Sequence, residues 1–345
     1  MRPLDFIVHA LSRRAARPLF RSMMRGRATI FMLHRVTDTA HGVSGHSLEF
    51  VHAAIRALRQ SGAQFVPVRR IMEACANGTE PGDDWVAFTI DDGFADQAMM
   101  ARSVFAAEHC PVTVFLISGL VDGKLWPWDD HLAYAIDHTQ AAQLDVTLEN
   151  KHLRLPLQSS QQRSHSLEQL RNHCKRLVNN DVYAVADAVA RQLGVTLPDT
   201  APPAYRPLTW DEARALESQG VEFAPHSISH RIFSRLSAAE AREEITQSWR
   251  RLQEELAHPL PLFAWPTGRP DDYTERDVAL VRDAGLQACA STDADYTHTD
   301  PRAGHVHGLC NLRRFPLPTR IRDVLQYGSW IERGKQILRG ALPGR

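Results

Sequence analysis

The chain has 345 residues, enough for one large α/β domain or two ordinary ones, and its 43% hydrophobic content is sufficient for a substantial core. Lysine plus arginine and aspartate plus glutamate both number 40, so no net charge favours nucleic acid as a partner. No apolar run approaches the ~20 residues that would span a bilayer. Five dispersed cysteines without CxxC spacing indicate buried reduced thiols, and hence a cytoplasmic location.

The N-terminal segment, residues 1–28, carries seven arginines against one acid, Asp5. Its apolar residues recur near helical spacing, but no continuous apolar stretch resembles a secretory signal. The pattern predicts a basic, amphipathic N-terminal helix over 1–27. Such a helix could lie on an anionic membrane surface or pack against the rest of the fold, and Pro18 would interrupt a single long helix.

Apolar runs of strand length alternate with helix-like segments through most of the chain. Alternation of this kind indicates parallel strands joined by helices. Residues 123–207 depart from the alternation and indicate an insertion. We therefore expect an α/β fold, a distorted (β/α) barrel of about seven parallel strands over 28–318 with a mainly helical insertion, followed by a C-terminal helix over 319–345. Strands are expected at 28–33, 86–90, 112–117, 221–224, 262–265 and 288–292.

Two adjacent carboxylates, Asp91 and Asp92, end the strand expected over 86–90 and precede Gly93. Neighbouring residues on a strand point to opposite faces, so the two acids can share one site only where the strand gives way to a loop. There, one could bind a cation while the other accepts a proton. A solvated Asp-Gly turn is the alternative interpretation.

Two histidines, His226 and His230, follow the strand expected over 221–224. Neutral imidazole suits zinc and its first-row relatives, and a carboxylate is a suitable third ligand. Histidines at this spacing are more often structural. In a parallel barrel, however, the acids and the histidines would both lie at the carboxyl ends of strands, where active sites form. Three such ligands leave coordination positions open, as a catalytic site requires.

The sequences TIDDG at 89–93 and HSISH at 226–230 resemble the first two motifs of the polysaccharide deacetylases, the NodB-type or family-four carbohydrate esterases. The resemblance extends from about residue 28 to 318. It implies one divalent metal ion, with Zn²⁺ expected first and Ni²⁺, Co²⁺ or Fe²⁺ as alternatives. Asp91 is then the general base, and the metal ligands are Asp92, His226 and His230.

The general acid of this family is a histidine in a Leu-x-His motif near the C-terminus, which in permuted relatives moves to an N-terminal strand. The sequence MLH at 32–34 resembles that strand, so His34 is the expected acid. His258 also follows a Leu-x pair, but it ends a predicted helix that comes before the third motif. That position does not match the acid of the family, so His34 is favoured. His305 and His307, in a polar loop, remain as alternatives, and a lone histidine after a strand is often structural.

The sequence PTG at 266–268 resembles the third motif, normally Arg-x-Pro-x-Gly, but Ala264 stands where the arginine would be. In the family that arginine orients the catalytic aspartate. Arg314 or Arg269 could supply the missing guanidinium, although a surface ion pair is the alternative for either. A backbone N–H after this motif could donate to the oxyanion. Candidate substrate contacts, with core packing or helix capping as alternatives, are Trp128, Asp129, Trp265, Pro266 and Gly268.

As a whole, the resemblance implies metal-dependent removal of the acyl group from an N-acetylated sugar in a polysaccharide, an oligosaccharide or a lipid-linked glycan. The enzyme would be a hydrolase of carbon–nitrogen amide bonds, as used in exopolysaccharide biosynthesis. We also expect a cytoplasmic protein that contacts the inner membrane peripherally through residues 1–28. The alternatives are a metal-dependent phosphoesterase, which needs a second ion, and an inactive carbohydrate-binding relative, suggested by Ala264 and the missing C-terminal histidine.

Overall fold

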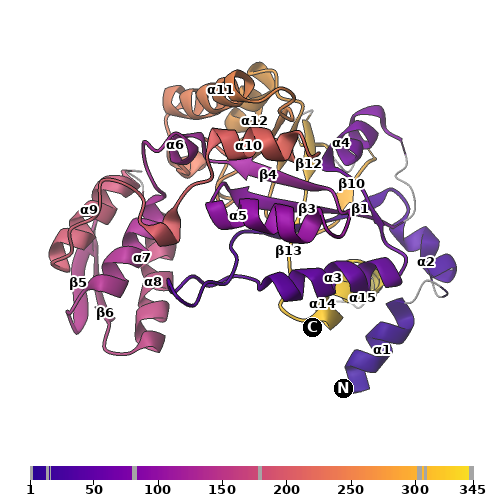
Figure 1. Cartoon of the computed structure of the whole chain (residues 1–345), viewed down its shortest axis with the longest axis horizontal. Coiled ribbons are helices and arrows are strands. Elements are labelled where there is room, and N and C mark those ends of the chain that lie inside the picture. Colours follow the sequence, from indigo (N-terminus) through magenta and orange to yellow (C-terminus); the bar gives the residue numbers. More distant parts are fainter. Residues whose placement is uncertain are drawn as a thin grey trace.

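The computed structural model describes residues 3–12, 15, 17–79, 84–177, 181–300, 305–306 and 309–341. Its centre is a curled, mainly parallel sheet (Figure 1). Five strands pair in parallel across one part of it, in the order β13 (Phe315–Pro316), β1 (Arg27–Leu33), β3 (Trp85–Asp92), β4 (Val112–Leu116) and β7 (Glu222–Pro225).

A second parallel group continues the curvature and consists of β8 (Leu262–Ala264), β9 (Ala288–Ala290) and β12 (Leu309–Leu312). The two groups meet where the Leu260 N–H donates to the Phe223 carbonyl at 2.7 Å. Among the described residues, seven parallel strands of three or more residues therefore form the wall, which confirms the expected distorted barrel. Three two-residue strands are added at its margins: β2 (Gln64–Phe65), β10 (Thr297–His298) and β11 (His305–Val306).

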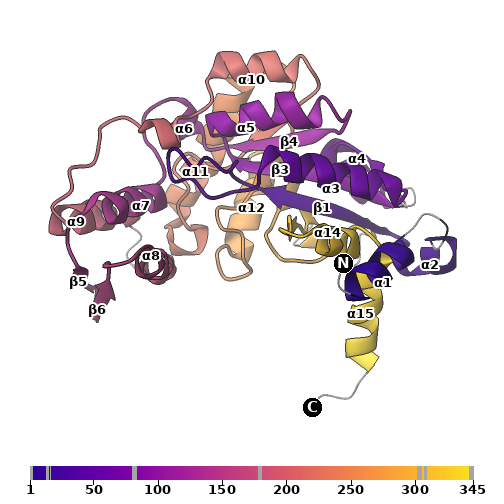
Figure 2. The same ribbon diagram turned by 60° about the horizontal axis from the view of Figure 1, so that its bottom comes forward.

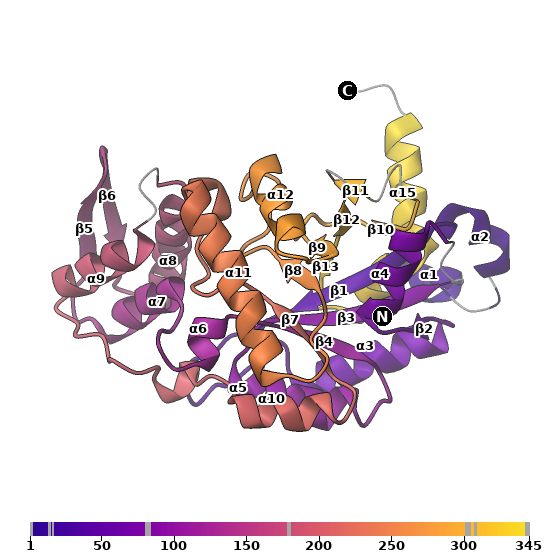
Figure 3. The same cartoon turned by 90° about the horizontal axis from the view of Figure 1, so that it is seen from above.

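Helices cover the outside of the barrel, with α3, α5 and α10 on one face and α11 and α12 farther round (Figures 1 and 3). The α10 helix begins at Thr209 with the capping box that its sequence predicts, closed by Glu212. The outer helices are α3 (Leu48–Gln60), α4 (Val68–Asn77), α5 (Ala95–Met100), α6 (Ser118–Val121), α10 (Trp210–Glu217), α11 (Ala238–Glu255) and α12 (Glu275–Asp283).

Side-chain alternation along β3 explains how a carboxylate comes to point into the barrel. Phe88 and Ile90 pack outward, in the hydrophobic cluster that includes residues of α3. Ala87 belongs instead to the inner cluster, which is built largely from small side chains. Because strand side chains alternate with a period of two, Asp91 lies on the same inner face as Ala87, at the carboxyl end of the strand.

The insertion forms a lobe of its own beside the carboxyl ends of the strands (Figure 2). Its elements share a separate hydrophobic cluster, which allows it to pack as a unit. The expected mainly helical character is present, and the alternating residues 144–148 form one arm of a hairpin. The lobe consists of α7 (Trp128–His138), β5 (Gln143–Leu148), β6 (Lys151–Pro156), α8 (Ser160–Cys174) and α9 (Val182–Gln192).

Both termini differ from the single helices that we expected. The N-terminal segment forms α1 (Pro3–Ser12) and α2 (Arg17–Met24), and the C-terminal one forms α14 (Ile321–Tyr327) and α15 (Trp330–Ala341). The C-terminal break falls at Gly328, which packs so closely against the end of the Leu58 side chain that an added Cβ would displace it. Trp330 joins the terminal helices, because its ring stacks on Phe20 and its indole N–H donates to the Leu11 carbonyl.

The cysteines correct another expectation. Cys75 of α4 and Cys310 of β12 form a disulfide, while Cys110, Cys174 and Cys289 are buried free thiols. Because the two partners are 235 residues apart in sequence, their pairing became visible only in the folded chain. The expected cytoplasmic location rested on five reduced thiols, and two of them are paired here. The location therefore stays a prediction. Within the described ranges, every helix is too short or too polar to cross a bilayer.

Candidate metal centre and active site

Three side chains from two strand ends converge on one point. Asp92 ends β3, and His226 and His230 follow β7; one ligand atom from each lies within 4.8 Å of the others. The Nε2 atoms of both histidines are 3.7 Å from Asp92 Oδ1. The three residues are thus arranged as a ready set of two nitrogen ligands and one oxygen ligand.

Both imidazoles are neutral, and the one of His226 carries no proton on the atom that faces Asp92, as metal binding requires. Nδ1 of His226 lies 2.8 Å from the Ala264 carbonyl, so it donates there and leaves Nε2 with a free lone pair. Burial lowers the pKa of His226 to about 3 and that of His230 to about 4, so both rings are neutral near pH 7. The group that orients the His226 ring is thus a backbone carbonyl.

The carboxylate of Asp92 is buried without compensation from the protein. Its Oδ1 has no hydrogen-bond partner among the described residues. Burial raises its pKa well above the ordinary range, and the charges of Asp91 and Asp129 raise it further. A buried acceptor of this kind is costly unless something positive satisfies it, and a cation between Asp92 and the two imidazoles would do so.

The loop that carries the histidines is held in an unusual backbone shape by Glu244 of α11. One carboxylate oxygen of Glu244 accepts the Ile228 and Ser229 N–H groups at 2.8 and 3.0 Å, and the other accepts the Ser229 hydroxyl. Asp92 and His230 both have positive φ, +96° and +55°, which is uncommon for residues with side chains. The surrounding contacts keep these strained ligands in place.

The insertion also holds the histidine loop. The Trp128 indole N–H of α7 donates to the His230 carbonyl at 3.1 Å, and the Tyr183 hydroxyl of α9 donates to the Ser229 carbonyl at 3.0 Å. The lobe therefore contributes to the geometry of the metal centre as well as to the walls of the pocket. Trp128 is fully buried in this role and does not line the pocket, which favours the alternative of core packing over a contact between its ring and substrate.

Asp91, the neighbour of the metal-binding carboxylate, is held by an arginine from the far end of the chain. Arg314 lies between β12 and β13, and its Nη1 and Nη2 donate to the two oxygens of Asp91 at 2.6 and 2.9 Å. Nη1 also reaches Thr89 Oγ1 at 3.1 Å. Burial disfavours the charged form of Asp91, but Arg314 outweighs it and lowers the pKa. Arg269, the other candidate, makes no contact with Asp91 in the structure.

Gln97 ties the ends of β1 and β3 together. Its amide nitrogen donates to the His34 carbonyl at 2.7 Å and to the Asp91 carbonyl, and its amide oxygen accepts the Gly93 N–H at 2.9 Å. His34, the first residue after β1, is thereby fixed beside the acid pair, and its side chain remains open to solvent. Although solvent reaches the ring through the pocket, the protein around it removes part of its hydration and so lowers the pKa of His34, while the Asp91 charge opposes this effect.

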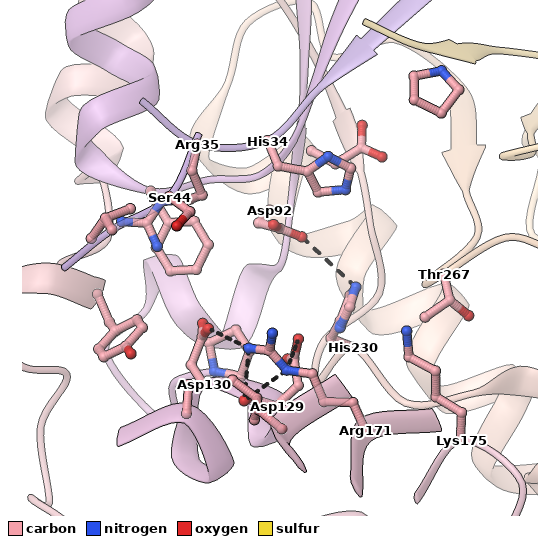
Figure 4. Close-up of a pocket in the computed structure, with 18 of the residues that line it drawn as sticks. His34, Arg35, Ser44, Asp92, Asp129, Asp130, Arg171, Lys175, His230 and Thr267 are labelled. Carbon is pink, nitrogen blue, oxygen red and sulfur yellow. Dashed lines mark hydrogen bonds and ion pairs between the residues drawn. The ribbon is translucent and has the colours of Figure 1, made fainter. Parts of the chain in front are cut away.

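A pocket of about 640 Å³ opens over these residues, between the barrel and the insertion. Figure 4 shows Asp92 with His34 on one side and His230 on the other, and a wall formed by the insertion. On that wall, Arg171 lies within 4 Å of carboxylate oxygens of both Asp129 and Asp130. The pocket has the size of a small-ligand site, and its lining is rich in charged groups.

The third motif contributes less to the pocket than expected. Thr267 lines it, whereas Trp265, Pro266 and Gly268 do not, and Trp265 is buried in a cluster on the outer side of β8. The Gly268 and Arg269 N–H groups already donate to the Pro266 carbonyl and to Asp272, so neither is free to bind an oxyanion. Asp129 does line the pocket, and its contact with substrate stays a prediction.

Two of the rival histidines for the acid role, His258 and His305, do not line this pocket. His258 lies at a separate surface hollow near the amino ends of the barrel strands, and His305 is part of β11. His307 falls outside the described residues. Of the described histidines considered for this role, His34 is the one that lines the pocket.

Several residues important to the site escaped the sequence analysis. Gln97 and Glu244 lie on outer helices, and Tyr183 and Lys175 lie in the insertion, so none belongs to a recognisable motif. Gln97 follows Gly93 by four residues, a spacing that could have drawn attention to it. The role of Glu244 depends on the packing of α11 beside the histidine loop, which no short pattern encodes.

Comparisons with known proteins agree with this geometry. A family profile described as "Polysaccharide deacetylase" matches residues 78–289, more than half of the chain. Among solved structures, the chain resembles the deacetylase PplD of Streptococcus pyogenes in complex with acetate, with 14% identity and a TM-score of 0.56 over 88% of this chain and 98% of that one.

Two further structures are similar. IcaB from Ammonifex degensii has 15% identity and a TM-score of 0.55 over 88% of this chain and 97% of that one. A polysaccharide deacetylase from Bacillus cereus has 14% identity and a TM-score of 0.55, and the match covers 88% of this chain and 70% of that one. No match was found among curated proteins. The chain therefore belongs to the polysaccharide deacetylase family, of the NodB type, and is a hydrolase that acts on the N-acetyl amide bonds of glycans.

Proposed function

We propose that this chain removes acetyl groups from an N-acetylated glycan with one divalent metal ion held by Asp92, His226 and His230. The observation that carries the proposal is the convergence of these ligands beside Asp91, in one pocket. The donor set fits a cation, because both imidazoles are neutral, Nε2 of His226 is unprotonated, and Asp92 Oδ1 is buried without a partner. Zn²⁺ is the first candidate for two nitrogens and one oxygen, with Ni²⁺, Co²⁺ and Fe²⁺ as alternatives.

When bound, such a cation polarises the amide carbonyl and lowers the pKa of a water molecule. In the proposed mechanism, Asp91 accepts the proton of the attacking water. Its lowered pKa keeps it ionised, and Arg314 fixes both of its oxygens. Arg314 is thus a positioning residue. It takes the role of the third-motif arginine of the family, whose place in this sequence is occupied by Ala264.

His34 is the proposed general acid and gives a proton to the amine that leaves. It lines the pocket near Asp92, and Gln97 holds its backbone. The Asp91 carboxylate favours the protonated imidazole and so counteracts the effect of burial. Protonation of His34 and ionisation of Asp91 therefore support each other, as an acid–base pair requires.

The two alternative functions have less support. A two-metal phosphoesterase needs a second group of ligands, and within the described ranges the only group of three or more suitable side chains is the one around Asp92. The inactive alternative arose from Ala264 and the missing C-terminal histidine. Arg314 contacts Asp91, and His34 lines the pocket, so both reasons for it are weakened.

The test combines metal analysis with acetate release from a chitooligosaccharide. We expect one divalent ion per chain, activity in the wild type, and loss of activity in Asp91→Asn with the metal retained. His226→Ala should lose both metal and activity. Acetate release that persists in Asp91→Asn, or without a divalent ion, would reject the mechanism.

We further propose that the terminal helices contact an anionic membrane surface. Six large apolar side chains are exposed among the described residues, and all but Met99 lie on α1, α2 or α15. Residues 1–28 add a large excess of arginine. Exposed apolar groups together with basic ones are typical of interfacial helices. These helices lie at the end of the molecule away from the insertion (Figure 2).

A further inference from the structure

Two cations that line the pocket lack a partner for their charge. Lys175 directly follows α8 of the insertion, and Arg269 follows β8. The structure gives neither side chain a hydrogen bond or ion pair within the described ranges. Other arginines of the same pocket are engaged: Arg35 pairs with Asp96, and Arg171 lies beside two carboxylates.

The two cations reach the site from different parts of the fold. Figure 4 shows the amine of Lys175 projecting between His230 and Thr267, and Thr267 precedes Arg269 by two residues. Lys175 is partly buried, whereas Arg269 is exposed at the mouth of the pocket. The lobe and the barrel therefore each contribute one positive charge beside the metal centre.

The acids nearby do not neutralise Lys175 at contact distance. Asp129 lies on the same wall and attracts Lys175 electrostatically, but no ion pair forms between them. Asp129 is already beside Arg171, which approaches its carboxylate to 3.8 Å and donates to its backbone carbonyl at 3.0 Å. A partly buried ammonium without a close partner is unfavourable, so a ligand that supplies an oxyanion would gain a charge-assisted hydrogen bond here.

We propose that Lys175 and Arg269 form an anion subsite, and that the natural substrate carries an oxyanion next to its N-acetylated sugar. The inference rests on the proposed function and narrows its substrate class. A guanidinium binds phosphate or carboxylate with two parallel hydrogen bonds, and a lysine adds a point charge. The oxyanion is therefore either a phosphoryl group on the sugar or the carboxylate of a neighbouring uronic acid.

Binding to the metal-loaded Asp91→Asn enzyme, measured by calorimetry, tests this subsite without turnover. The probes are N-acetylglucosamine 1-phosphate, a disaccharide of N-acetylglucosamine and glucuronate, and neutral diacetylchitobiose. We expect at least one charged probe to bind about a hundredfold more tightly than the neutral one, since two cations take part and a hydrogen bond to a charged group is equivalent to about tenfold or more in affinity. The charged probe that binds more tightly identifies the source of the oxyanion.

Substitutions then test whether Lys175 and Arg269 cause the preference for charged probes. Lys175→Met and Arg269→Met should each reduce the ratio of charged to neutral affinity by about tenfold. The matched control is Lys151→Met, which removes an exposed lysine from the β5–β6 hairpin of the same insertion, outside the pocket. Equal binding of charged and neutral probes, or a ratio in Lys175→Met equal to that in Lys151→Met, would overturn the subsite.

The subsite and the proposed function fail in different ways. Acetate release from neutral sugars with no preference for charge would remove the subsite and leave the deacetylase. A preference for charged probes without acetate release from any of them would leave the subsite and remove the proposed reaction. Raising the salt concentration should also reduce the preference, because it screens the exposed Arg269.

Discussion

The guanidinium of Arg314 holds both oxygens of Asp91, at 2.6 and 2.9 Å, although 223 residues separate the two in the chain. Both side chains are almost completely buried. Arg314 also stacks over Phe115 at 5.1 Å and donates to the Ser291 carbonyl, so its position is fixed from several strands. The ion pair thus connects the last strands of the barrel with the acid pair of β3.

Removing Arg314 should therefore destabilise the fold as well as the site. We expect Arg314→Met to lower the free energy of unfolding by about 3–5 kcal/mol, because it leaves the Asp91 carboxylate buried and unpaired. Acetate release should fall by at least about a hundredfold, since the carboxylate loses its orientation. Urea unfolding and activity assays measure the two effects.

Two variants control this prediction. Arg313→Met removes a partly exposed neighbour that pairs with Asp293 and Asp295, and it should cost no more than about 1 kcal/mol. Adding Asp91→Asn to Arg314→Met should restore part of the lost stability, because no buried charge remains unpaired. A double variant no more stable than Arg314→Met would contradict this account.

Glu244 offers a separate test of the loop that carries the metal ligands. Glu244→Leu should weaken metal binding about 10–100-fold, since groups that orient metal ligands have effects of this size. The physical reason is that Ile228 and Ser229 lose their common acceptor and His230 is no longer held in its strained backbone shape. Competition with a chromophoric chelator measures the affinity. Glu243→Leu, an exposed position on the same helix, is the matched control and should bind metal as the wild type does.

The sequence was sufficient to predict the parts of the site that lie in short motifs at strand ends. Asp91, Asp92, His226 and His230 could be assigned because alternating strands and helices imply a barrel, and the carboxyl ends of its strands meet. The choice between Arg314 and Arg269 could not be made, because it depends on how the last strands return to β1. Both candidates follow strands, and only the closed barrel separates them.

Two other features of the chain also depended on tertiary structure. The sequence left substrate contact and core packing open for Trp128, and in the structure the residue packs in the core of the lobe and donates to the histidine loop. Tertiary packing decided the role of that residue. The disulfide was hidden because cysteine spacing carries no information when the partners are 235 residues apart.

The disulfide itself can be tested by counting thiols. In denaturant without reductant, we expect three reactive thiols, from Cys110, Cys174 and Cys289, and five after reduction. Because the bond joins α4 to β12 and closes a long loop, Cys75→Ser with Cys310→Ser should lower the free energy of unfolding by about 2–5 kcal/mol. Five reactive thiols before reduction, in protein purified without reductant, would restore the original expectation of free cysteines.

Membrane contact gives the last prediction. Sedimentation with vesicles should recover more protein on phosphatidylglycerol than on phosphatidylcholine, because the arginines of residues 1–28 attract anionic lipid. Leu19 of α2 and Leu338 of α15 are 78% and 66% exposed, so Leu19→Glu with Leu338→Glu should reduce vesicle binding while the protein stays folded. Met99→Glu places a charge at the other exposed apolar residue, away from these helices, and should bind vesicles as the wild type does. Equal recovery on both lipids, or no difference between the two variants, would mean that the exposed apolar residues serve some purpose other than membrane contact.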